Sequence, residues 1–437
     1  MSCCSSGNWE GNLLTVEVII IALLMFFLLV GIHEWGHFYF AKRVGILVRE
    51  FAIGFGPKLL SIKRNETRYT FRLLPMGGYV RMAGEDPEIV QINPGQTIAV
   101  KIENEKVTHI YLDQLDQRTD VILGTVDSID LEHKLNIKLD VDGELQDLDV
   151  HEKAMMETKG KETQIAPWDR QFGSKTIAQR ALVIVAGPVM NFILAFFLFI
   201  AFIYMSGITV DNPTHWQVGK VTNDSPAEMG GLQARDIIIE VNGHKIGVDD
   251  NEKLLALISE SADQPMNWIV SRDQSDIQLQ VTPKADDTGS GRVGISLQLE
   301  KRNPDSIIEG VTFASKTMWN VTEQIFISLK MLVTLQFSLD DLGGPIRITE
   351  MTGEAVSYGV DTLVGFVAMI SLYLGIFNLL PFPALDGSRL MFFGIEAVRG
   401  KPVDPNRESM VHFIGFAVLM LLMIAVTYND ILRLFKG

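Results

Sequence analysis

Four long apolar segments constrain the fold of this chain more than any other feature. They cover about 13–38, 181–208, 363–385 and 411–426, and charged side chains are rare in all four. About 20 apolar residues are needed for a helix to cross a bilayer, and a span must satisfy its backbone polar groups internally. With 47% hydrophobic residues and a mean hydropathy of +0.20, the chain is predicted to be a multi-pass α-helical membrane protein with four transmembrane helices.

The first apolar segment ends in His33-Glu34-Trp35-Gly36-His37. Positions i and i+4 share one helix face, so both histidines can point at one metal ion, with Glu34 beside them. In zinc proteases this pattern supplies two zinc ligands and a general base. The alternative is a pair of histidines at the membrane surface beside a solvated Glu34. Ionisable groups at membrane depth are energetically costly, and they usually occur there because they have a function. The motif therefore predicts peptide hydrolysis inside a membrane.

A third zinc ligand is expected, because catalytic zinc generally has three protein ligands and a water. The third apolar segment ends in Asn378-Leu379-Leu380-Pro381-Phe382-Pro383-Ala384-Leu385-Asp386-Gly387. Its prolines interrupt the helix and leave Asp386 at the end of an apolar span, where zinc would satisfy the carboxylate. A hydrated helix end is the alternative, and the residues alone leave both open. Asp340 and Asp341 are predicted to face solvent, with a role as rival ligands also left open.

The order of these motifs resembles the site-2 protease family of intramembrane zinc metalloproteases. Segments 46–57 and 74–80 are similar to its bacterial branch. The best match is the Gram-positive regulator of sigma-factor proteolysis, which has a single PDZ domain. The resemblance implies cleavage within transmembrane segments of anti-sigma factors, signal-peptide remnants or pheromone precursors. It implies that an upstream protease trims these substrates on the outer side first. The expected partners are therefore single-span membrane proteins and the lipid bilayer.

The resemblance also implies roles for single residues. The zinc (Zn²⁺) ligands would be His33, His37 and Asp386. Glu34 would be the general base, taking a proton from water and passing it to the leaving amine. The expected substrate-binding residues are Asn378 and Asn191, the latter in Gly187-Pro188-Val189-Met190-Asn191.

The apolar segments divide the chain into eight expected parts. These are a first transmembrane helix over 1–41, a membrane-associated β-hairpin or sheet over 42–90, a cytoplasmic β-rich insertion over 91–167, a second helix over 168–210, an extracytoplasmic α+β PDZ domain over 214–302, an amphipathic interfacial helix over 303–345, a third transmembrane helix over 346–390 and a fourth over 408–437. Alternating apolar and polar residues predict the β regions. The hairpin could pair with an extended substrate, and the PDZ groove with a peptide end. A purely structural role is the alternative for each.

Basic residues predict the orientation in the cell membrane. Lys and Arg gather between Lys42 and Arg81, directly after the first span, and reappear after the third. The positive-inside rule then places 42–180 in the cytoplasm and 211–362, both termini and the PDZ domain outside. The metal site would lie toward the cytoplasmic side. The net charge of −15 gives no support to nucleic-acid binding. Cys3 and Cys4 are adjacent and form no disulfide framework.

Two other classes of protein share some of these features. A metal transporter would also place histidine and aspartate in its spans, but it would need no PDZ domain. A catalytically silent scaffold could gather membrane proteins through that domain. Only the protease requires Glu34 for chemistry, so the effect of Glu34→Gln separates the protease from the other two classes.

Overall fold

A computed structural model describes residues 16–85, 92–115, 118, 120–222, 224–273, 275–286, 288–334, 336 and 343–436. Cys3, Cys4, Asp340 and Asp341 lie outside this set. The chain forms two compact units. The first contains 1–195, 327–353 and 369–437, and the second contains 196–326 and 354–368.

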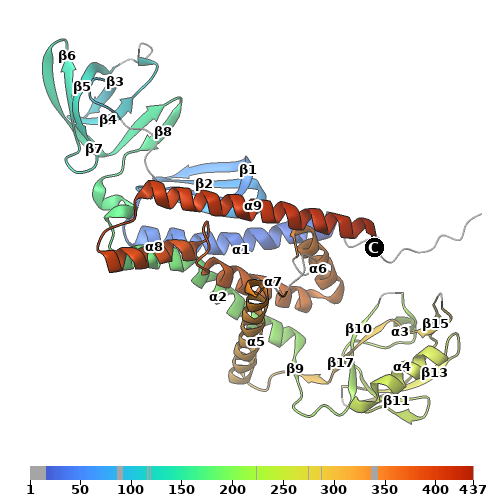
Figure 1. Ribbon diagram of the computed structural model, residues 1–437. Helices are drawn as coiled ribbons and strands as arrows, with labels where there is room; N and C mark the ends of the chain where they lie inside the picture. Colours follow the sequence, from blue (N-terminus) through green and yellow to red (C-terminus); the bar gives the residue numbers. More distant parts are fainter. Residues whose placement is uncertain are drawn as a thin grey trace, which may run out of the picture. The chain divides into compact units, whose positions relative to one another are not determined.

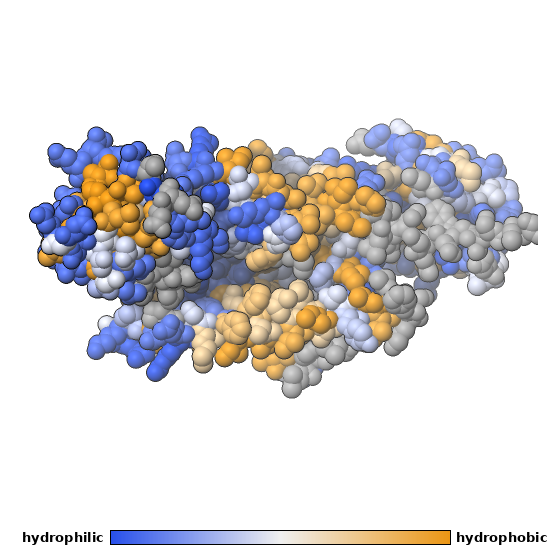
Figure 2. Space-filling view, turned by 90° about the horizontal axis from the view of Figure 1, so that it is seen from above, coloured by the Kyte–Doolittle hydropathy of each residue, from blue (hydrophilic) through white to orange (hydrophobic). Residues whose placement is uncertain are grey.

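Four helices in the described part of the chain are long and apolar enough to cross a membrane. They are α1 (Val16–Arg43), α2 (Ile177–Ser206), α7 (Val360–Asn378) and α9 (Pro405–Lys436). Large apolar side chains such as Leu24, Phe197 and Leu421 are exposed on them, and hydrophobic surface gathers over the helical part of the molecule in Figure 2. The prediction of four apolar helices is confirmed.

The single transmembrane helix predicted over 346–390 is instead a series of three helices. They are α6 (Pro345–Tyr358), α7, and α8 (Asp386–Arg399). Gly359, with φ +124°, separates the first two, because glycine adopts left-handed conformations without a Cβ clash. Pro381 and Pro383 separate α7 from α8, because proline lacks the N–H that a helix interior needs. Asp386 therefore lies in the first turn of α8 and not at the end of a span.

The hairpin after α1 doubles back on itself. Strand β1 (Val48–Arg64) pairs with β2 (Thr67–Met82), and Phe51 lies opposite both Tyr69 and Val80. The first half of β1 is thus flanked by the two halves of β2. Residues 78–82 pair with 48–53 on one side, and no pairing with another described strand occupies their other side. A side chain of this segment packs against the membrane helices, because Val80 shares a buried cluster with Val30 and Ile184.

An ion pair ties the tip of the first strand pair to the segment before α2. Glu66 accepts hydrogen bonds from Arg170 Nη1 at 2.8 Å and Nη2 at 2.7 Å. These bonds, with a further one from Gln164, lower the pKa of Glu66 to about 2 although partial burial opposes the shift. The pair is therefore ionised at neutral pH, and it fixes the sheet to the chain that enters α2.

The insertion between the sheet and α2 is a small β-barrel (Figure 1). Its strands are β3 (Thr97–Glu103), β4 (Lys106–Tyr111), β5 (Ile122–Asp130), β6 (Asn136–Val141), β7 (Glu144–Thr158) and β8 (Lys161–Gln164). The order is β4-β3-β5-β6-β7-β8, and a parallel pairing of β4 with β7 closes the ring around a buried core. Closure removes free strand edges. Two 3-10 turns, η2 (Trp168–Arg170) and η3 (Phe172–Ser174), lead into α2.

The second unit contains a six-stranded sheet around buried Trp268, with the order β14-β13-β11-β10-β17 and with β12 paired to β11. Its main elements are β10 (Trp216–Val221), β11 (Ile237–Val241), α4 (Asn251–Glu260), β13 (Met266–Arg272), β14 (Ser275–Val281) and β17 (Ile295–Leu299). Shorter elements are β9 (Ile208–Thr209), α3 (Pro226–Met229), β12 (His244–Lys245), η4 (Val248–Asp250), β15 (Lys284–Ala285), β16 (Gly291–Arg292) and β18 (Lys301–Arg302). Asn242 and Gly243 have φ of +49° and +78°, as a type I′ hairpin turn requires. Helix α5 (Ile307–Val333) follows.

Candidate metal centre

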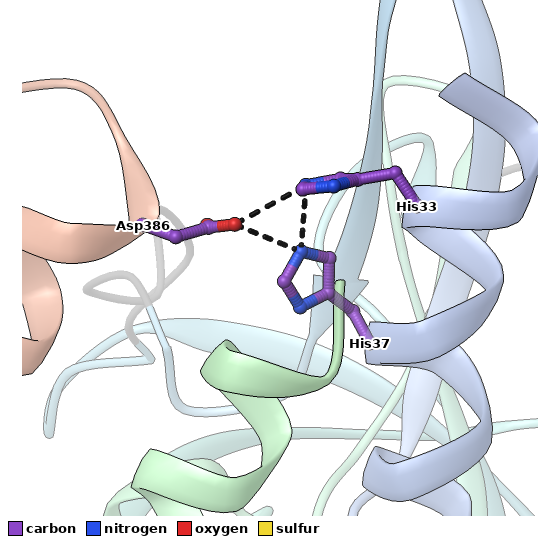
Figure 3. A group of neighbouring side chains, drawn as sticks. All are labelled: His33, His37 and Asp386. Carbon is purple, nitrogen blue, oxygen red and sulfur yellow. Dashed lines mark hydrogen bonds and ion pairs between the residues drawn. The ribbon is translucent and has the colours of Figure 1, made fainter. Parts of the chain in front are cut away.

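Three side chains predicted to bind zinc converge in the first unit (Figure 3). Nε2 of His33 and Nε2 of His37 lie 3.2 Å and 3.3 Å from Oδ2 of Asp386. The two Nε2 atoms are 3.2 Å apart. Helix α1 places the histidines one turn apart, and the first turn of α8 brings the carboxylate from the far end of the chain.

The triangle fits a zinc ion. Tetrahedral zinc with bonds of about 2.1 Å separates neighbouring ligand atoms by about 3.4 Å, close to the separations found here. Oδ2 of Asp386 is buried and accepts no hydrogen bond within the described part of the chain. A buried carboxylate oxygen without a partner is unfavourable, and a cation between the three atoms would satisfy it. The donor set, two imidazoles and one carboxylate, is typical of catalytic zinc.

The second ring nitrogen of each histidine has a partner that can set its tautomer. His37 Nδ1 donates to the carbonyl oxygen of Val183 at 2.9 Å, which leaves Nε2 unprotonated and able to bind metal. His33 Nδ1 lies 3.1 Å from Nδ2 of Asn191, and Oδ1 of the same amide is buried with no hydrogen-bond partner among the described residues. Nε2 of His33 is free for metal when Nδ1 carries the proton, so the amide must then present its oxygen to the ring. The backbone carbonyl of Asn191 accepts from Ser371 at 2.9 Å, which fixes this turn of α2 to α7.

The structure places Asn191 behind His33. Its side chain is completely buried and is absent from the lining of the cleft; its amide lies beside His33, and the substrate contact stays a prediction. The sequence carried a signal for this placement, because Gly187 and Asn191 are four residues apart and share one face of α2. A Cβ at position 187 would lie 2.9 Å from Nε2 of His33, so both residues face the same imidazole.

Removing the Asn191 amide should weaken zinc binding. We expect Asn191→Leu to lower zinc affinity by about 10- to 100-fold, as loss of a hydrogen-bond partner behind a metal-bound histidine typically does. Asn191→Asp keeps an oxygen acceptor and should retain most of the affinity. Competition of the purified protein with a chromophoric chelator measures both variants. Equal affinity of the leucine variant and the wild type would show that the amide does not orient His33.

Glu34, the predicted general base, follows His33 on α1. Its side chain is buried between α1 and the edge of β2 and lines the same cleft as the two histidines. A Cβ on Gly78 would lie 2.7 Å from Glu34 Cγ, so only glycine lets the strand approach the carboxylate this closely. Sequence reasoning assigned no such role to Gly78.

The cleft has a volume of about 620 Å³ and joins the metal centre to the strand edge. It is lined by the metal triangle, Glu34, Glu85, Arg389, Asn378 and residues 77–82, together with apolar side chains of α1, α2 and α7. Asn378 donates its amide to Leu374 O at 2.9 Å, which leaves its amide oxygen as the group that can meet an extended chain. Arg389 forms an ion pair with Glu85 at the margin of the cleft.

Comparison with known proteins gives matches along nearly the whole chain. The family model described as Peptidase family M50 matches residues 21–422. Zinc metalloprotease RasP of Oceanobacillus iheyensis is 41% identical over 432 residues, which cover 96% of this chain and 100% of that protein. Regulator of sigma-W protease RasP of Bacillus subtilis is 42% identical over 428 residues, covering 96% of this chain and 99% of that protein. Probable protease eep of Enterococcus faecalis is 40% identical over 429 residues, covering 96% and 100%.

One solved structure covers a smaller part. The PDZ domain of an SdrC-like protein from Listeria monocytogenes aligns with 21% of this chain and 93% of its own length, at 21% identity and a TM-score of 0.18.

Proposed function

Because the chain belongs to peptidase family M50, we propose that the cleft around His33, Glu34, His37 and Asp386 hydrolyses peptide bonds within the transmembrane segments of other proteins. The chain is a zinc metalloprotease of the site-2 protease type and a multi-pass membrane protein.

One observation carries the assignment of the site. Three metal-binding atoms lie 3.2–3.3 Å apart in the same cleft as a buried carboxylate and an unpaired strand edge. A transporter would need the ligands, but neither the carboxylate as a base nor the strand edge. A scaffold would need none of the three.

Each group has a separate task in the proposed reaction. Zinc held by His33, His37 and Asp386 would polarise the scissile carbonyl and acidify a water molecule. Glu34 takes the proton from the attacking water and later gives it to the leaving amine. His37 keeps its Nε2 atom unprotonated because its Nδ1 donates to Val183, and the Asn191 amide does the same for His33 when its oxygen is turned toward Nδ1. Glu34 is buried where α1 meets Gly78 of β2, in the same cleft as the metal triangle.

The strand edge can make the substrate accessible, because the peptide bonds of a helical substrate are shielded within the helix. An extended chain can add to an unpaired edge through backbone hydrogen bonds. Residues 77–82 offer such an edge along the cleft, and Asn378 lines the same cleft. Pairing there would hold a substrate segment unwound, with its carbonyls open to attack.

The substrates follow from the chemistry and from the relatives. The Bacillus subtilis relative is named for its regulation of sigma-W. We infer that this chain likewise takes single-span membrane proteins, such as an anti-sigma factor, once an upstream protease has removed their outer part. Signal-peptide remnants and pheromone precursors belong to the same chemical class.

The PDZ-like domain of the second unit offers a separate strand edge. Strand β17 pairs with β10 and ends the order of the sheet. Its residues Ile295 and Leu297 pack against a core that includes Leu254 and Ile258 of α4. We propose that a peptide end binds along β17. We further propose that this domain is extracytoplasmic, because the basic residues that follow the first span favour the cytoplasm for 42–180.

The test uses the full-length protein in liposomes with a single-span substrate that has been trimmed on its outer side. We expect cleavage within the transmembrane segment, loss of cleavage after zinc removal with a chelator, and recovery when zinc is returned. An untrimmed substrate serves as the control for the outer domain. Cleavage that persists in zinc-free protein, or its absence from zinc-loaded protein, would reject the proposed function.

A further inference from the structure

The turn before Asp386 has an unfavourable backbone conformation. Ala384, two residues upstream, has φ +75°, in the left-handed region that residues with a Cβ rarely occupy. Such a conformation persists only where neighbouring groups hold it. The position of the Asp386 carboxylate therefore depends on whatever holds the turn.

Helix α9 holds this turn at two points. The backbone N–H of Ala384 donates to Nδ1 of His412 at 3.2 Å. Three residues further along α9, Gly415 packs on Pro383, where a Cβ would lie 2.6 Å from the carbonyl oxygen. Residues i and i+3 share one helix face, so His412 and Gly415 together form a contact surface for residues 383–384.

His412 is itself fixed in place. Its ring makes an edge-to-face contact with Phe392 of α8, with centroids 5.8 Å apart. Because Nδ1 accepts the N–H of Ala384, the proton of the neutral ring resides on Nε2. That atom is buried and lies 3.7 Å from Oε1 of Glu408, one turn earlier on α9. The imidazole thus cannot turn away from Ala384 without losing its contact with α8.

We propose that His412 is a positioning residue for the metal centre, and that Gly415 assists it. By holding Ala384 in its left-handed conformation, α9 places the Asp386 carboxylate opposite His33 and His37. This inference rests on the proposed function, since it takes Asp386 as a zinc ligand. Helix α9 thus supports the metal centre, although it contributes no ligand.

The first experiment compares two replacements of His412 in the full-length protein in detergent. His412→Phe keeps a ring against Phe392 but removes the acceptor, and we expect zinc affinity to fall about tenfold, as when a buried donor loses its partner. His412→Asn keeps an acceptor near the place of Nδ1 and should stay within about threefold of wild type. Introducing Ala384→Gly into the phenylalanine variant should recover part of the loss, because glycine adopts positive φ freely.

A second readout needs no zinc. Hydrogen exchange of the peptide covering 379–387 in zinc-free protein should quicken in His412→Phe and remain slow in His412→Asn. Gly415→Ala should quicken exchange and weaken zinc binding as well, because its Cβ meets the backbone of Pro383. Gly394→Ala on α8 is the matched control, since a Cβ there meets nothing within 4 Å. Should a variant not fold, the Gly415 and Gly394 pair still tests the proposal.

The outcomes separate this inference from the function on which it rests. If wild type binds zinc and His33→Ala does not, the metal site stands. Equal zinc affinity and exchange in wild type and His412→Phe would then overturn the positioning role alone. If wild type itself binds no zinc at these residues, the proposed function fails, while the exchange data still report whether His412 holds Ala384.

Discussion

Replacing Glu34 with glutamine is expected to reduce peptide cleavage by about 10³-fold or more while zinc binding stays intact. The amide has nearly the same shape as the carboxylate but cannot accept a proton from water, and general acid–base catalysis contributes about 10²- to 10⁴-fold. Glu34 supplies no atom to the metal triangle, so the metal should remain. The measurement is single-turnover cleavage of a trimmed single-span substrate, with zinc content determined on the same samples.

A matched control lies on the same helix. Glu17 is exposed in the first turn of α1, and Glu17→Gln makes the identical chemical change far from the cleft. It should cleave at the wild-type rate. A fully active Glu34→Gln protein with bound zinc would remove Glu34 as the base, and a transporter or scaffold would then account better for the site.

Gly187→Ala is expected to eliminate tight zinc binding although it changes no ligand. The new Cβ would lie 2.9 Å from His33 Nε2 and closer still to the His37 ring. The His37 ring cannot swing away cheaply, because its Nδ1 is bonded to Val183 and the side chain is buried. We expect zinc affinity to fall at least about 100-fold, since even loss of a supporting partner behind a ligand lowers it by 10- to 100-fold.

Zinc titration of the apo protein measures this effect, and Gly394→Ala again supplies the control for adding a methyl group to a helix. Both variants should show the same thermal unfolding without metal if the alanine acts on the site alone. Wild-type zinc affinity in Gly187→Ala would mean that the histidines bind metal in a different arrangement from the one described.

How far the sequence predicts this site depends on how local the determinants are. His33 and His37 were predictable because helix periodicity alone places them on one face. Asp386 needed its motif, since no periodicity links residues so distant in the chain. The spacing of Gly187 and Asn191 places them on one face of α2, but only the structure shows that this face meets His33. Gly359 and the two prolines indicate where the helices within 346–390 end. The apolar composition of this segment nevertheless favoured the prediction of one continuous helix.

The pairing register of β1 and β2 could not be predicted from the sequence. Alternation predicted strands between 46 and 83, but it could not show that Phe51 pairs with both Tyr69 and Val80. In that register Val80 packs in one buried cluster with Val30 of α1 and Ile184 of α2, two helices that are distant in the sequence. Pairing register depends on tertiary contacts whenever one face of a sheet is buried. The strand edge along the cleft was therefore beyond prediction from the chain alone.

This edge has a consequence for selectivity. Backbone amides and carbonyls are the same in every residue except proline, so an edge that binds through them is nearly indifferent to side-chain identity. What varies between candidate segments is the free energy needed to leave the α-helix, which glycine and β-branched residues lower. We therefore expect the enzyme to discriminate among membrane segments by how easily they unwind, so that it reads helix stability more than amino-acid sequence.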